Sequence, residues 1–145
     1  MVRHRGHWHS SLKPGHITGG WATVYWLGWL LIAGGFGAVW YSSRTTGLAT
    51  WWLGPESAPN TLTSLLPFIT PFALAFLAIR VTRFLPWIGI GGAAVTALIA
   101  LGDLADQPKY AAVEFALAGA GLAISAACFA GVLRAVDGQD GPPAA

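Results

Sequence analysis

The residues nearest the start of the chain that could do chemistry are three histidines. His4, His7 and His9 fall in the stretch "RHRGHWHS". Imidazole nitrogens bind zinc and copper, so this spacing is a weak candidate for a metal site. However, the stretch has no acidic residue to orient the imidazoles, as carboxylates beside metal-bound histidines usually do. We favour a positively charged tag next to a membrane, whose histidines gain charge near about pH 6.5. The sequence therefore predicts neither a metal nor a cofactor.

A second candidate group is polar and lies in the last third of the chain. Asp103, Asp106 and Lys109 are close in sequence, and Glu114 follows. An ionisable residue inside a membrane span is a functional candidate by default, and these four could bind a cation or a basic partner. The simpler interpretation is that Glu114 favours a helix N-terminus electrostatically and pairs with Lys109. We favour the simpler interpretation and keep the four as a candidate polar cluster on the outer face of a membrane.

Known reaction templates do not fit the chain. Asp103-x-x-Asp106 begins like the carboxylate motif of phosphatidyl-alcohol transferases, but Gln107, Pro108 and Lys109 replace the glycine and the Ala-Arg pair that should follow. Small multidrug exporters carry an essential glutamate in their first span, and the first apolar stretch here has no charge. No histidine falls in an apolar stretch, which excludes haem ligation by two histidines. We therefore expect no catalytic residues and no enzyme.

The elements that hold these residues follow from composition. Of the 145 residues, 54% are hydrophobic and only 10% are charged, whereas soluble domains carry about 25% charged residues. A bilayer core about 30 Å thick is crossed by roughly 20 apolar residues in a helix. Four stretches qualify, and the sequence predicts an all-α integral membrane protein with four transmembrane helices in a compact antiparallel bundle, at about 21–41, 62–82, 86–103 and 110–133.

The remaining segments are expected to flank or connect these spans. We expect a basic, histidine-rich segment at 1–20, a transmembrane domain at 21–134 and a disordered tail at 135–145. The first span is expected to be a retained signal anchor, because its apolar run exceeds the 7–15 residues usual in a cleaved signal. In the loop at 42–61, a tryptophan segment is expected to lie in the membrane interface. The alternative is that this segment docks another subunit.

The orientation of the bundle follows from its basic residues, because cytoplasmic loops carry an excess of lysine and arginine. With four spans, one side would hold both termini and the turn between the second and third spans. That side has Arg3, Arg5, Lys13, Arg80, Arg83 and Arg134, and the other has Arg44 and Lys109. We therefore expect a multi-pass protein of the plasma (inner) membrane of a bacterium with both termini in the cytoplasm.

Small and aromatic residues predict how the spans pack and where they meet the headgroups. Small residues at four-residue spacing let helices approach closely; the candidates are Ala33, Gly37, Gly89, Ala93, Ala112, Ala116 and Ala120. Tryptophan and tyrosine are enriched at membrane interfaces; the expected anchors are Trp21, Trp40, Trp51, Trp52, Trp87 and Tyr110.

Without a catalytic group or a charged transport path, the sequence favours a structural role. We expect an accessory or interaction subunit of a larger membrane complex for transport, respiration or envelope synthesis. The expected partners are membrane lipids and either other membrane subunits or further copies of this chain, but not nucleic acid. The alternative is a small oligomeric transporter or channel that uses the outer-face carboxylates, and a membrane enzyme comes third.

Overall fold

The computed structural model describes residues 17–54, 62–80 and 83–137, and these residues form helices and parts of the segments between them, without strands. The histidine-rich stretch and the last eight residues, 138–145, lie outside the described part. The helices are α1 (Gly19–Thr46), the short 3-10 helix η1 (Leu62–Leu65), α2 (Leu66–Arg80), α3 (Leu85–Asp103) and α4 (Pro108–Asp137).

Four of these segments are long and apolar enough to cross a membrane, with η1 and α2 counted as one. The prediction of an all-helical chain with four candidate spans is confirmed at this level for the described residues. The candidate spans are Gly19–Thr46, Leu62–Arg80, Leu85–Asp103 and Pro108–Val132.

Local sequence explains where several helices begin and end. α1 runs past the expected end at residue 41 and stops where Gly47 adopts a φ of 70°, the left-handed conformation that commonly ends a helix. Pro86 lies in the first turn of α3, and α4 begins at Pro108. Proline suits these positions because its missing N–H would have no helical partner there.

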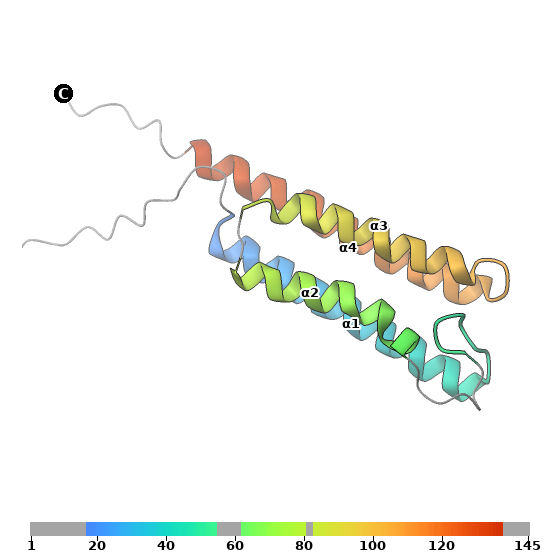
Figure 1. The fold of residues 1–145 in the computed structure, drawn as a ribbon. Helices are drawn as coiled ribbons and strands as arrows, with labels where there is room; N and C mark the ends of the chain where they lie inside the picture. Colours follow the sequence, from blue (N-terminus) through green and yellow to red (C-terminus); the bar gives the residue numbers. More distant parts are fainter. Residues whose placement is uncertain (1–16, 55–61, 81–82, 138–145) are drawn as a thin grey trace, which may run out of the picture.

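The helices form two layers, one made of α1 and α2 and the other of α3 and α4, and neighbours in sequence run antiparallel (Figure 1). α4 also packs against α1, and α2 against α3, so the four helices form a closed square in chain order. We call the end with residues 47–54 and the α3–α4 turn the loop end. The opposite end, with the start of α1, the end of α2, the start of α3 and the end of α4, is the terminal end (Figure 1).

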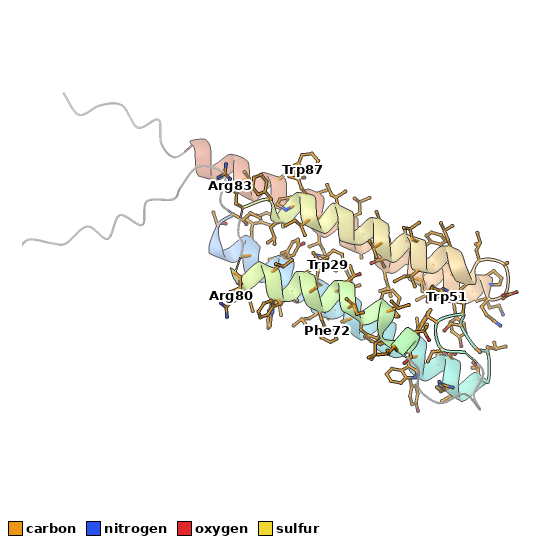
Figure 2. All side chains as sticks on the ribbon, in the orientation of Figure 1. Trp29, Trp51, Phe72, Arg80, Arg83 and Trp87 are labelled. Carbon is orange, nitrogen blue, oxygen red and sulfur yellow. The ribbon has the colours of Figure 1, made fainter. Side chains whose placement is uncertain are left out.

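Large side chains of α1 pack against glycines of α4 between the layers. Trp29 is fully buried, and Figure 2 places it between the two hairpins. A Cβ atom on Gly121 would lie 2.8 Å from Cη2 of Trp29. In the reverse direction, Ile124 fills the space over Gly28 in α1. At these two positions the contact between α1 and α4 depends on glycine, which leaves room for a large side chain of the other helix.

The expected packing residues divide between the inside and the outside of this bundle. Ala33, Gly89 and Ala93 are buried, and Gly37 is half-buried. The alanines of the fourth span instead point away from the other helices: Ala112, Ala116 and Ala120 are all exposed. α4 turns its Gly121 and Ser125 side toward the bundle, and the alanines lie on the opposite side of the helix.

Candidate functional site

The α3–α4 hairpin buries two carboxyl groups at the loop end. Asp103 is the last residue of α3, and Glu114 lies in the second turn of α4, on the other side of a short turn. Both side chains are 0% exposed. Because the two helices are antiparallel neighbours, the short turn brings the two carboxyl groups together, close enough to influence each other electrostatically.

The loop from α1 folds over these carboxyls and binds both. The backbone N–H of Trp51 donates to Oδ1 of Asp103 at 2.8 Å, and its indole Nε1–H donates to the carbonyl of Ile99 at 2.9 Å. The indole Nε1–H of Trp52 donates to Oε1 of Glu114 at 2.9 Å. Residues 50–54 thus connect the α1 hairpin to both helices of the other hairpin.

Trp52 is the central side chain of this contact. It is 0% exposed, and its ring meets the rings of Phe36 and Phe68 edge to face, with centroids 6.4 Å apart in each pair. Such aromatic pairs stabilise beyond the area that they bury. Trp52 was expected as an interfacial anchor, but the structure places it inside the bundle because Glu114 offers its indole N–H a buried acceptor.

One oxygen of each carboxyl receives a tryptophan N–H, and the other has no donor. Oδ2 of Asp103 and Oε2 of Glu114 are buried without a hydrogen-bond donor among the described residues. An ionised carboxylate can only accept hydrogen bonds. A hydrogen bond between the two groups therefore requires that one of them carries a proton.

The other two members of the expected polar cluster lie outside. Asp106, in the turn, and Lys109, in the first turn of α4, are exposed. The structure thus separates the four residues into a buried pair and two surface charges. It also gives Glu114 the Trp52 indole as its partner rather than Lys109. The spacing of Asp103 and Glu114 across a short turn could have indicated their pairing, but no sequence feature indicates the tryptophan donors.

The other residues expected to anchor the spans at the membrane interface differ in how exposed they are. Trp51 and Trp87 are exposed, at the loop end and the terminal end respectively (Figure 2). Trp40 and Trp21 are half-buried, Trp40 beside Phe68 and Trp21 over Gly131. The hydroxyl of Tyr110 shares hydrogen bonds with Ser42 and Thr46, at 3.2 and 2.9 Å. Such contacts tie the end of α1 to the start of α4.

A second polar region lies between the layers. Thr96 and Ser125 are buried, and their hydroxyls donate to carbonyls of their own helices, at 2.9 and 2.7 Å. Tyr25 and Trp29 are also fully buried, and the Tyr25 hydroxyl and Trp29 Nε1 have no hydrogen-bond partner among the described residues. Their rings lie 6.1 Å apart. This region has no histidine or carboxylate in the described part, and we assign it to packing.

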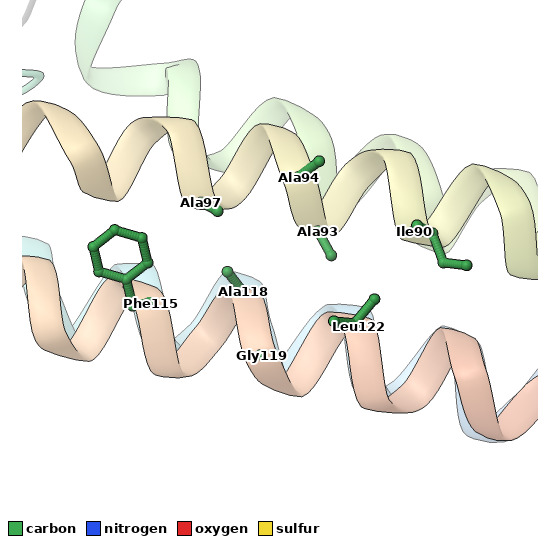
Figure 3. A pocket seen from close by; sticks show the side chains of 8 residues that line it. All are labelled: Ile90, Ala93, Ala94, Ala97, Phe115, Ala118, Gly119 and Leu122. Carbon is green, nitrogen blue, oxygen red and sulfur yellow. The ribbon is translucent and has the colours of Figure 1, made fainter.

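The outer surface of α4 consists mainly of small side chains, although Val113 and Leu122 are also exposed. Eight exposed positions from one end of the span to the other are alanine or glycine: Ala112, Ala116, Gly119, Ala120, Ala123, Ala126, Ala127 and Ala130. We call this set the alanine face. Beside it, an apolar groove of about 290 Å³ runs between α3 and α4, with Ala94, Ala97 and Gly119 among its lining residues (Figure 3).

Among the residues that the structure describes, no three histidine, cysteine, aspartate or glutamate side chains come together as a metal site. The candidate ligands His4, His7 and His9 lie outside those residues. Comparisons with protein-family models, with curated proteins and with solved structures found no match to this chain.

Proposed function

We propose that this protein is an interaction subunit of a membrane complex and that its alanine face binds a transmembrane helix of another subunit. The observation that carries the proposal is that all eight positions of this face are exposed and small. Lipid tails are as apolar as leucine, so helices in a bilayer associate through close backbone approach, which small residues permit.

The dimensions of the alanine face suit a membrane-spanning partner. From Ala112 to Ala130 the helix rises about 27 Å at roughly 1.5 Å per residue. This length is close to the bilayer core of about 30 Å. A partner helix could therefore lie against α4 over most of the membrane. The adjoining groove between α3 and α4 offers space for the larger side chains of that helix.

We further propose that the terminal end faces the cytoplasm of a bacterium and that the membrane is the plasma membrane. Arg80 and Arg83 lie at the terminal end, together with the start of α1 (Figures 1 and 2). Of the other basic residues that we assign to this side, Arg3, Arg5 and Lys13 precede α1 in the sequence, and Arg134 belongs to the last turns of α4. The excess of positive charge thus favours this end as the cytoplasmic one.

Accessibility of single cysteines tests this orientation. With Cys128→Ala as background, a membrane-impermeant thiol reagent should label Asp106→Cys in intact cells and Gly19→Cys only after permeabilisation. Both positions are exposed, and a side chain at Gly19 meets no atom within 4 Å. The opposite pattern would invert the proposed orientation.

Site-specific photocrosslinking in native membranes tests the interaction. A photoreactive residue at Ala123, on the alanine face, should give a discrete product with a second membrane protein. The same residue at Phe76, on the exposed side of α2, should give none. Leucine at Ala116 and Ala127 should abolish the product from Ala123 without lowering the amount of protein in the membrane.

Two results would contradict the proposal. Equal crosslinking from Ala123 and Phe76 would mean that the alanine face has no specific partner. A product with the mass of two copies of this chain would make the face a homo-oligomer contact and would favour the small transporter instead.

A further inference from the structure

The buried carboxyl pair is not needed for a partner on α4, because Glu114 points into the bundle and not toward the alanine face. Asp103 and Glu114 each use one oxygen to accept a tryptophan N–H. Their other oxygens, Oδ2 and Oε2, are buried without a donor among the residues that the structure describes, and the two carboxyls lie close enough to influence each other electrostatically. Each carboxyl thus keeps one buried oxygen without a donor, which a shared proton would satisfy.

The surroundings disfavour two negative charges here. No lysine or arginine of the described residues forms an ion pair with either carboxyl, and burying an unpaired charge is costly. The charged groups nearby are Arg44 at the end of α1, Asp106 in the α3–α4 turn and Lys109 at the start of α4. Asp106 adds negative charge close to Asp103. The described residues of η1, α2 and the 47–54 segment contribute no ionisable side chain near this end.

A metal ion suits the pair less well than a proton. Hard cations such as Ca²⁺ take six or more oxygen ligands, and the described residues bring no third carboxylate to this place. Two neighbouring buried carboxyls instead resemble a dyad that shares one proton, whose titration belongs to the pair.

We propose that Asp103 and Glu114 form a binding site for a single proton and that this proton keeps the Trp51–Trp52 segment docked on the loop end. With the proton bound, one carboxyl donates to the other and both accept from the tryptophans. When the proton leaves, each carboxylate accepts its tryptophan N–H more strongly, but the two buried like charges repel. We expect them to move apart toward water, and this movement releases the segment that bonds to both. Trp51, whose backbone N–H donates to Asp103, is itself 46% exposed, so the docked segment reaches the surface.

Infrared difference spectroscopy on the full chain in lipid nanodiscs tests proton binding directly. At neutral pH the protein should show the carbonyl band of a protonated carboxylic acid. Glu114→Gln should remove this band while its amide oxygen still accepts from Trp52 and its NH₂ group donates to Asp103. Asp106→Asn, a change at an exposed carboxyl of the same end, should keep the band.

A wild-type protein without the band at neutral pH would overturn the proposal, and this result needs no variant to fold. Loss of the band on addition of Na⁺ or Ca²⁺ would overturn it as well, because the pair would then be a metal site. A band that persists in both Glu114→Gln and Asp103→Asn would assign the proton elsewhere.

Tryptophan quenching by a soluble quencher tests the docking. Quenching of the wild-type protein should rise as the pH is raised and the proton leaves. The rise in quenching should be absent in Glu114→Gln, because glutamine has no proton to lose at this site. The rise should be smaller in Trp52→Phe, which would assign part of the quenching signal to Trp52. Quenching that is independent of pH in the wild type while the infrared band disappears would refute the link between proton and loop.

Discussion

The outward sides of α2 and α4 are both free of the other helices, yet they are made of opposite residues. On α2, Ile69, Phe72, Phe76 and Ile79 are each more than half exposed, and Phe72 projects from the bundle in Figure 2. On α4 the central strip is the alanine face alone. Large flexible side chains fill the irregular space among lipid tails, whereas a smooth strip permits another backbone to come close. The comparison indicates that burial inside one chain does not explain all the small residues of α4.

The inner side of α4 shows a second use of small residues. Gly121 accommodates Trp29, and Gly131 lies under Trp21. On this side the small residue makes room for a large side chain of the same protein. The two sides of α4 therefore have similar composition for different reasons, and substitutions can separate them.

The largest effect on stability is expected for a substitution on the inner side of α4. Gly121→Ala should lower the stability of the bundle by about 1–3 kcal/mol, because overpacking a filled interface forces shifts in its neighbours. The new Cβ would lie 2.8 Å from Cη2 of Trp29. Reversible unfolding in mixed micelles measures the change. An unaltered stability would mean that Trp29 moves without cost and that α1 and α4 are loosely packed.

The next effect concerns the alanine face. Ala116→Leu and Ala120→Leu together should weaken partner binding roughly tenfold or more, equivalent to about 1.4 kcal/mol, because leucine blocks close approach. Binding is measured by energy transfer between labelled subunits in nanodiscs, once the crosslinked partner is identified. The unfolding free energy should stay unchanged, since both positions are exposed. A fall in stability with binding retained would show instead that this side supports the bundle itself.

A smaller effect on stability is expected at Gly119, and it should differ in sign from the effect at Gly121 of the same helix. Gly119 is exposed, and an added Cβ would meet nothing within 4 Å. Gly119→Ala should therefore stabilise α4 by up to about 1 kcal/mol through its better helix propensity. The same unfolding assay used for Gly121→Ala measures it, and a destabilisation of similar size for both variants would remove the distinction between the two sides.

The smallest effect is expected on α2. Phe72→Leu with Phe76→Leu exchanges one large apolar side chain for another at exposed positions of α2, so partner binding should not change. Stability should stay within about 0.5 kcal/mol, as for other exposed substitutions. A loss of binding equal to that of the α4 leucines would place a second partner surface on α2.

Much of the fold could be predicted because it depends on local composition. Four apolar stretches of sufficient length require helices in a bilayer, since each backbone polar group must be satisfied within its own segment. Proline and glycine at the ends of these stretches then mark where helices begin and stop, as at Pro86, Pro108 and Gly47. Short turns require antiparallel neighbours. None of these inferences needs a contact between distant residues.

The side of each helix that faces inward was decided only by the tertiary structure. Alanine and glycine occur all around α4, so their spacing does not distinguish the side that packs on Trp29 from the exposed alanine face. The carboxyl site likewise depends on contacts between residues that are far apart in the sequence. Trp51 and Asp103 are 52 residues apart, and Trp52 and Glu114 are 62 residues apart. A tryptophan in an apolar loop has the same local pattern whether its N–H meets a headgroup or a buried carboxyl. Only the packing of the two hairpins brings donor and acceptor together.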